Sequence, residues 1–323
     1  GPAPHSGPGR RARLLKGRKR GGHQDLVFLA VQLVVAATFL LRLFAGGPHA
    51  GCVRLLADLL ALQGMKLADL DYSLRAALYR LVALHGWDDM IFTHISMRVP
   101  GPEHHFLINP YGLMFDEITA SSLVKIDTGG KVIDDPLNLG CSPAGFIIHS
   151  SVYQARAEVN CVIHTHPEHV VAFSSLGKPL AAISNDGTMF SAGVPVFAET
   201  TDLITDQPRG KAVARTLGQS SILILRNHGL VAAGRTIEEA VFVAVKLEKA
   251  CRIQLLAEAA GGPKLFVKEE ELAAKRARTN RGDSQGNAFS YMVRRWHLRC
   301  GCEVPNQYQA TLENFDRSGY KGG

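Results

Sequence analysis

Hydrophobic positions along the middle of the chain recur with two different spacings, which predict a mixture of helices and strands. From about Asp69 to Leu84 the apolar residues follow a helical period, so an amphipathic helix is expected there, ending at Gly86. Short apolar or alternating runs follow, and each is bounded by turn residues. They predict strands at 92–99, 106–108 and 123–127.

The same reading continues through the second half of the chain. Pro167 suits the first turn of a helix, where its missing N–H is harmless, and Thr236 with Glu239 forms a capping box before a long apolar period. Helices and strands do not alternate strictly, which favours an α/β protein with a central, mostly antiparallel sheet and helices on its faces. The expected elements are a helix at 144–154, strands at 159–164, 221–225 and 230–234, and a long helix from 237 to the glycine pair at 261–262.

The two ends of the chain differ in composition from residues 65–262, which we expect to form the folded domain. Residues 1–64 form a basic and hydrophobic extension, and residues 263–323 are charged and polar without a strong period. We expect 263–323 to be a tail that docks on a partner subunit. Three interpretations of 1–64 stay open: appended sequence, since Met65 is the first methionine; a membrane anchor through residues 26–44; or a cleaved signal.

Charge and cysteine usage narrow the function classes. The net charge of +7 matches seven basic residues between Arg10 and Arg20, so the rest of the chain is near neutral and nucleic-acid binding is not expected. The six cysteines are scattered and form no disulfide framework. Cytoplasmic localisation is therefore expected, with membrane anchoring as the alternative.

Three histidines stand where strands are predicted to end. Residues two apart in a strand point to the same face, so His164 and His166 can present two imidazoles to one ion. His228 closes another predicted strand, and Gly229 after it allows a sharp bend. Three neutral nitrogens would leave a coordination position open, as in catalytic sites. A chance His-x-His pair among 13 histidines is the alternative.

Four motifs resemble those of the class II aldolase/adducin head family: Trp87 to Ser96, Leu107 to Gly112, Asn160 to Pro167, and Arg226 to Leu230. The resemblance extends from about Lys66 to Gly261. It implies a three-layer α/β/α sandwich, a homotetramer, and a divalent ion held by the three histidines. Zn²⁺ is the ion expected, with Mn²⁺ or Fe²⁺ as alternatives. Such an ion would act as a Lewis acid on a small-molecule substrate.

The chain departs from the family pattern around the expected substrate site. The position of the family's acidic general base is Gly145, which cannot move a proton. Thr93 and Ser96 represent the family's phosphate-loop element, and His94 replaces a substrate-binding Asn. We expect His149 and His94 to be the catalytic candidates. Thr93, Ser96, Tyr111 and Gly112 are expected to bind substrate, the last two through a glycine turn; structural roles are the alternatives.

The sequence therefore predicts a metal-dependent carbon–carbon lyase, an aldehyde-lyase or a carboxy-lyase, whose metal stabilises an enolate of a small carbonyl or carboxylate compound. Decarboxylation fits Gly145 better than a retro-aldol cut does, because loss of CO₂ can replace proton abstraction. Two alternatives remain: an adducin-like interaction module without catalysis, and a metal-dependent oxygenase. Adducin heads are expected to lack the metal histidines, so their presence favours the enzyme.

Overall fold

The computed structural model describes residues 77–101, 103–279 and 282–300, all of which belong to one compact unit, Asp71–Gly323. The predicted extension 1–64, with its candidate anchor at 26–44, lies outside the described residues. Within the described part of the chain, no helix combines the length and the apolar character that crossing a bilayer requires. The described residues of the predicted first helix, 77–84, are helical.

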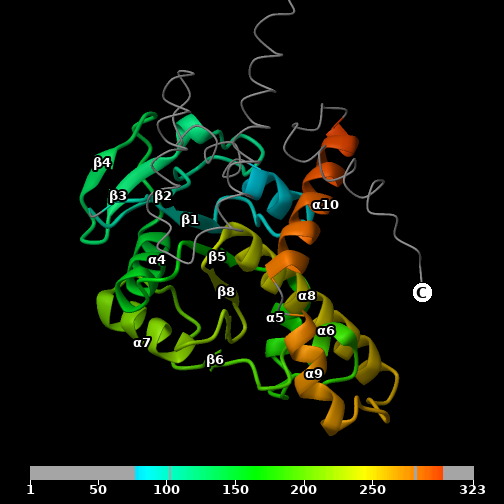
Figure 1. The fold of residues 1–323 in the computed structure, drawn as a ribbon. Coiled ribbons are helices and arrows are strands. Elements are labelled where there is room, and N and C mark those ends of the chain that lie inside the picture. Colours follow the sequence, from blue (N-terminus) through cyan, green and yellow to red (C-terminus); the bar gives the residue numbers. More distant parts are fainter. Residues whose placement is uncertain (1–76, 102, 280–281, 301–323) are drawn as a thin grey trace, which may run out of the picture. The chain divides into compact units, whose positions relative to one another are not determined.

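Eight strands form one sheet at the centre of this unit (Figure 1). Their order is β4-β3-β2-β1-β5-β8-β7-β6, and all neighbouring pairs are antiparallel except β6 and β7. The mostly antiparallel sheet predicted from the sequence is thereby confirmed. The strands are β1 (His94–Arg98), β2 (His105–Ile108), β3 (Val124–Asp127), β4 (Val132–Asp134), β5 (Cys161–Thr165), β6 (Val196–Phe197), β7 (Ile222–Leu225) and β8 (Gly229–Gly234).

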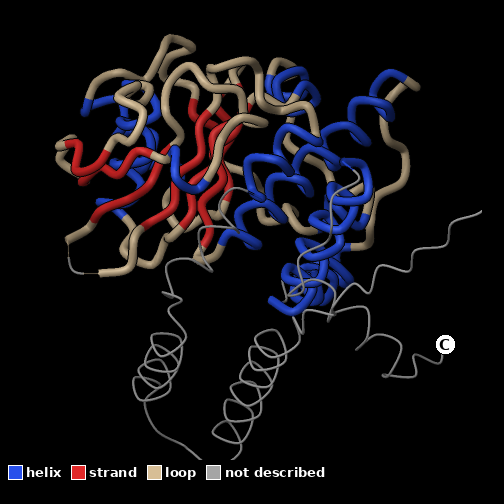
Figure 2. The backbone as a smooth tube through the Cα atoms, turned by 90° about the horizontal axis from the view of Figure 1, so that it is seen from above, coloured by secondary structure: helices blue, strands red, loops and turns tan. Residues whose placement is uncertain are grey.

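Helices cover both faces of the sheet, as Figure 2 shows, so the predicted α/β/α sandwich is also confirmed. Side chains alternate between two hydrophobic clusters along the strands: Cys161 and Ile163 of β5 belong to one cluster, and Val162 between them to the other. Helices α4 (Pro143–Ala155) and α7 (Gln207–Leu217) cover one face. The other carries residues 77–84, α5 (Glu168–Ser174), α8 (Ile237–Ala259) and α10 (Gly282–Cys300).

Polar side chains define where these helices begin. Ser142 accepts a hydrogen bond from the N–H of Gly145 at the start of α4, and Thr236 accepts one from Glu239 at the start of α8. The predicted capping box is only half formed, because the Glu239 carboxylate accepts from the N–H of Arg235 instead of Thr236.

The short elements are the 3₁₀ helix η1 (Ala120–Ser122) and the helix α6 (Asn185–Thr188).

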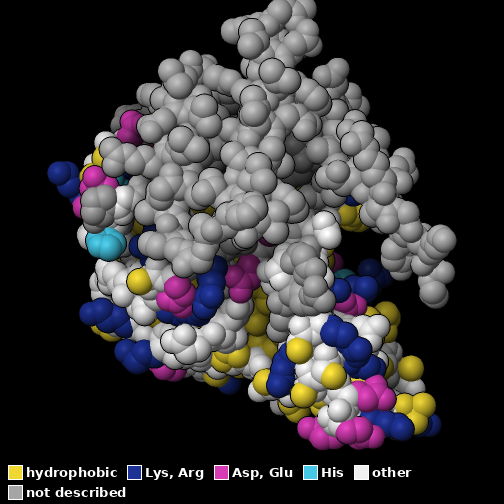
Figure 3. Space-filling model, viewed as in Figure 1, with side chains coloured by type: hydrophobic (Ala, Val, Ile, Leu, Met, Phe, Trp, Pro, Cys, Tyr) yellow, Lys and Arg dark blue, Asp and Glu magenta, His cyan; other side chains and the backbone are white. Residues whose placement is uncertain are grey.

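The described residues after 262 are largely helical, which the sequence pattern did not predict. It contains α9 (Glu269–Thr279) and α10, and α10 places Phe289, Met292 and Val293 in the same hydrophobic cluster as α8. These positions follow a helical i, i+3, i+4 spacing inside a charged sequence. Figure 3 shows acidic and basic side chains side by side over the end of the molecule that α9 occupies. Helix α10 thus packs against the core through these three side chains.

Candidate metal centre

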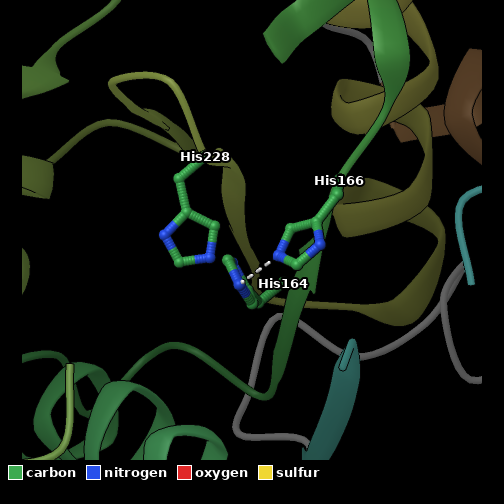
Figure 4. Close-up of side chains that lie close together, drawn as sticks. All are labelled: His164, His166 and His228. Atoms are coloured by element: carbon green, nitrogen blue, oxygen red, sulfur yellow. Dashed lines mark hydrogen bonds between the residues drawn. The ribbon is translucent and has the colours of Figure 1, made fainter. Parts of the chain in front are cut away.

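The three predicted metal-ligating histidines lie together at one end of the central strands (Figure 4). His164 stands in β5, His166 follows the end of that strand, and His228 lies in the turn between β7 and β8. One ring nitrogen from each histidine lies within 4.8 Å of the others. We refer to His164, His166 and His228 as the three-histidine cluster.

The turn that carries His228 depends on unusual backbone conformations. Asn227 has a φ of 57°, in the left-handed region that asparagine tolerates better than most residues. Its N–H donates to the Ser174 hydroxyl at 2.8 Å, which fixes the turn on α5. A Cβ at Gly229 would lie 2.8 Å from Cδ2 of His166 and would also meet the Thr165 carbonyl oxygen. Glycine at this position therefore allows β8 to approach the other two ligands.

Hydrogen bonds determine which ring nitrogen carries the proton in His164 and in His166. Nδ1 of His164 lies 2.9 Å from the Leu230 carbonyl oxygen, and Nδ1 of His166 lies 2.7 Å from Oδ2 of Asp89. A carbonyl or carboxylate oxygen can only accept, so each Nδ1 carries the proton and donates. In the neutral rings Nε2 then holds a lone pair. The two Nε2 atoms face each other at 3.1 Å, as the dashed line in Figure 4 shows.

Two facing lone pairs repel unless a proton or a metal cation lies between them. Burial, followed by the neighbouring imidazoles, holds the pKa of His164 well below its usual value, which disfavours the proton. Burial also lowers the pKa of His228 to about 4. Neutral imidazoles are the form that binds metals. Tetrahedral Zn²⁺–nitrogen bonds of about 2.0–2.1 Å place neighbouring nitrogens about 3.3 Å apart, close to the 3.1 Å observed. The cluster therefore fits a divalent ion.

A second histidine pair lies beside the cluster. His94 of β1 is the register partner of His164 in β5, and their ring centroids are 4.7 Å apart. Nδ1 of His94 lies 2.8 Å from Nε2 of His149 on α4. His149 in turn contacts the Ser96 hydroxyl through Nδ1, and Ser96 lies 2.9 Å from the hydroxyl of Tyr153. Burial, with a further contribution from nearby imidazoles, keeps the pKa of both His94 and His149 well below its usual value.

Gly145, the predicted position of the family's acidic base, is crowded by the His94 ring. A Cβ there would lie 2.9 Å from Cγ and 3.0 Å from Cδ2 of His94. The His94 ring is buried and hydrogen-bonded to His149, so it cannot turn away at little cost. The imidazole of His94 therefore takes the space beside α4 that a longer side chain at 145 would need.

The structure separates the predicted substrate contacts into two groups. Thr93 and Ser96 are buried, and the Thr93 hydroxyl donates to the Asp88 carbonyl oxygen at 2.7 Å, so both hydroxyls make internal hydrogen bonds. Tyr111 and Gly112 are exposed, and Gly112 has a φ of 93°. The Tyr111 N–H donates to the Gly140 carbonyl oxygen at 3.0 Å, so this N–H is not offered to an anion. The role of these four residues in substrate binding stays a prediction.

Sequence reasoning gave no role to Asp89, which contacts His166. Its backbone lies in the segment between Trp87 and β1, and its side chain is partly exposed. The signal that could have found it is topological: His94 pairs with His164, so the chain before His94 runs beside the chain after His164. That pairing places the acidic segment 88–89 close to His166.

The chain thus combines an α/β/α sandwich with a three-histidine cluster at the strand ends. The sequence model of one family, the class II aldolase and adducin N-terminal domain, matches residues 73–255, more than half of the chain. This protein belongs to the class II aldolase/adducin family.

Similar proteins include both bacterial aldolase-type proteins and animal adducins. An aldolase class 2 protein of Caulobacter vibrioides is 46% identical over 196 residues, which cover 60% of this chain and 75% of the relative. Alpha-adducin of Rattus norvegicus is 36% identical over 251 residues, 77% of this chain but only 33% of adducin. Among solved structures, an aldolase II superfamily protein of Pseudomonas syringae is 39% identical with a TM-score of 0.65, covering 69% of this chain and 90% of its own.

A further solved structure carries a specific enzyme name. L-fuculose 1-phosphate aldolase of Glaciozyma antarctica PI12 is 34% identical to this chain with a TM-score of 0.61. The match covers 70% of this chain and 88% of that aldolase.

Proposed function

We propose that this protein is a divalent-metal-dependent carbon–carbon lyase that acts on a small oxygenated carbonyl or carboxylate compound. The observation that carries the proposal is the pair of Nε2 lone pairs of His164 and His166, held face to face with His228 beside them. Such a donor set suits a divalent cation, and three imidazoles would leave a coordination position for substrate. Family membership and the similarity to an aldolase structure support lyase chemistry.

The three-histidine cluster would hold the ion, with Zn²⁺ proposed first and Mn²⁺ or Fe²⁺ as alternatives. A bound divalent ion supplies Lewis acidity, which polarises a carbonyl or carboxylate oxygen and stabilises negative charge that develops on it. His94 and His149 would relay a proton beside this site, because their lowered pKa values keep both rings neutral and a neutral imidazole can donate at one nitrogen while it accepts at the other. A homotetramer in the cytoplasm is part of the same proposal.

The residues around Gly145 favour decarboxylation over retro-aldol cleavage within this class. A retro-aldol cut requires a base for the substrate hydroxyl proton, and no carboxylate can occupy position 145 because His94 fills the space. Loss of CO₂ breaks the carbon–carbon bond without that proton transfer. The resulting carbanion would then take its proton from water, relayed through the neutral rings of His94 and His149.

The first experiment is elemental analysis of the purified full chain after loading with Zn²⁺ and removal of free metal. We expect about one ion per chain. The double variant His164→Ala/His166→Ala should lose it, because two of three ligands are removed, while His105→Ala in β2, outside the cluster, should keep it. A wild-type chain that takes up no ion from Zn²⁺, Mn²⁺ or Fe²⁺ would refute the enzyme proposal.

The second experiment distinguishes the reactions. The metal-loaded chain is incubated with ketose 1-phosphates, with 3-oxo and 2-hydroxy acids, and with air-saturated buffer. Release of CO₂ identifies a carboxy-lyase, release of an aldehyde identifies an aldehyde-lyase, and consumption of O₂ identifies the oxygenase alternative. Turnover must disappear in the double variant, which serves as the control for trace contaminants.

One observation favours the adducin-like alternative enough to keep it. The alpha-adducin match covers 77% of this chain, whereas the Caulobacter vibrioides match covers 60%. An interaction module would need neither bound metal nor turnover. A full chain that neither binds an ion nor turns over any of the probes would make this alternative the better account.

A further inference from the structure

Asp89 contacts His166 on the side of the ring that faces away from the three-histidine cluster. Its Oδ2 lies 2.7 Å from Nδ1 of His166, whereas Nε2 of the same ring points to His164. We propose that Asp89 is a positioning residue: its carboxylate selects the His166 tautomer with the proton on Nδ1 and so turns the Nε2 lone pair to the metal. The inference rests on the proposed metal-dependent function.

The two ligands on the β5 segment are oriented by different kinds of partner. His164 lies inside the sheet, and its Nδ1 donates to the backbone oxygen of Leu230 in the neighbouring strand. His166 lies beyond the end of β5, where no strand carbonyl takes this role, and its Nδ1 instead contacts the Asp89 side chain. A carboxylate partner of a metal-binding imidazole fixes the orientation of the ring and favours a doubly charged ion. His166 is therefore the ligand whose orientation depends on a side chain.

The backbone around Asp89 adopts a conformation that residues with side chains rarely adopt. Asp89 has a φ of 30° and Met90 a φ of 54°, so two consecutive residues with side chains occupy the left-handed region. Such a conformation persists only where surrounding contacts hold it, and it often occurs at functional sites. Here the Thr93 hydroxyl donates to the Asp88 carbonyl oxygen at 2.7 Å, and the Phe92 N–H donates to the Asp89 carbonyl oxygen at 3.1 Å.

The ends of this turn are fixed in the core. Trp87 before it is 6% exposed, and Thr93 after it is 1% exposed. Asn109 accepts from the N–H of Ile95 at 3.0 Å through its side-chain oxygen, which holds the start of β1. Between these fixed points, the turn at 88–92 carries the Asp89 carboxylate to His166. The left-handed turn and the Asp89–His166 contact thus occur together, as strained backbone and functional sites often do.

The test measures Zn²⁺ affinity of the full chain by competition with a chromophoric chelator, for the wild type and three variants. Asp89→Ala removes the acceptor, and we expect about 10–100-fold weaker binding. Asp89→Asn keeps an oxygen that can accept from Nδ1 but loses the charge, so its affinity should fall between those of Asp89→Ala and the wild type. Asp88→Ala removes the neighbouring carboxylate and should bind like the wild type.

A second readout separates positioning from general stability. Co²⁺ replaces Zn²⁺, and its visible absorption reports the geometry of the ligands. The Asp89→Ala spectrum should change in shape or intensity, whereas those of Asp89→Asn and Asp88→Ala should match the wild type. Unfolding midpoints of the metal-free chains show whether each variant folds. If Asp89→Ala does not fold, Asp89→Asn carries the test through its weakened affinity with an unchanged spectrum.

Three results would overturn the inference. Equal Zn²⁺ affinity of the wild type and the Asp89 variants, with one ion bound in each, would refute the role of Asp89 and leave the proposed metal centre standing. Equal weakening by Asp88→Ala and Asp89→Ala would show a general charge effect instead of positioning. A wild-type chain that binds no ion would overturn this inference and the proposed function together.

Discussion

Replacement of Gly145 by alanine should destabilise the protein, although the same change inside most helices stabilises it. Gly145 lies in the first turn of α4, where the new Cβ would lie 2.9 Å from Cγ of His94. Separations below about 3 Å are not tolerated by real Cβ atoms, so the ring must move. Movement of the ring would stretch or break its 2.8 Å hydrogen bond to His149 in the buried interior.

The expected magnitude follows from two opposing effects. Forcing an extra methyl group into a well-packed interior costs about 1–3 kcal/mol. Alanine gains about 1 kcal/mol over glycine in a helix interior, and the gain is an upper limit in the first turn. If about half of that gain is realised in the first turn, the net loss should be about 0.5–2.5 kcal/mol, which corresponds to a melting temperature about 1–10 °C lower for a domain of this size.

Thermal unfolding of the metal-free full chain, followed by circular dichroism, measures the effect. The control is the same change in a His94→Ala background. There the obstructing ring is absent, so Gly145→Ala should raise the melting temperature because only the helix-propensity gain remains. A Gly145→Ala variant as stable as the wild type while His94 is present would refute the reasoning, as would a loss of equal size in both backgrounds.

Three further predictions concern stability. The metal-free chain should lose stability as the pH falls from about 6.5 to about 4. Burial lowers the pKa of His164 and His228 in the folded state, so the unfolded chain binds more protons in this pH range. Urea unfolding midpoints measured across the range test this, and a flat profile would contradict it. Glu248→Ala should lower the free energy of unfolding by about 1–2 kcal/mol, because the Glu248 carboxylate accepts from two backbone N–H groups at the start of α5. In the same urea unfolding assay, the free energy of unfolding should change little in the matched variant Glu238→Ala, whose carboxylate is not at α5. Zn²⁺ at 100 times its dissociation constant should stabilise the chain by about 2.7 kcal/mol in thermal unfolding, an effect that EDTA reverses and the double variant lacks.

The clustering of the three histidines could be predicted because their positions depend on local rules. Residues two apart at a strand end share a face, and the buried runs around them identify β5 and β7 from hydrophobic pattern alone. The motif resemblance then supplied the fold, which the sheet order and the two helical layers confirm. Local periodicity and motif together were sufficient for these features.

Other features depend on contacts that local patterns do not contain. The contact between Asp89 and His166 requires knowledge that β1 pairs with β5. The lack of room at Gly145 depends on the rotamer of His94, a residue on a different element. Helix α10 was missed because its apolar positions are few within a charged sequence, and they become a core face only when α8 is beside them.

The pairing of β5 with β8 has a consequence for metal exchange. His164 and His166 are far from His228 in the sequence, so an ion that joined them in an unfolded chain would close a long loop and stabilise the fold by reducing chain entropy. The sheet has already closed that loop, because five register pairs join β5 to β8 and bring the ligand-bearing segments together. A bound ion could then dissociate and rebind while the sheet stays folded. The metal would therefore be exchangeable, and the fold would not require it.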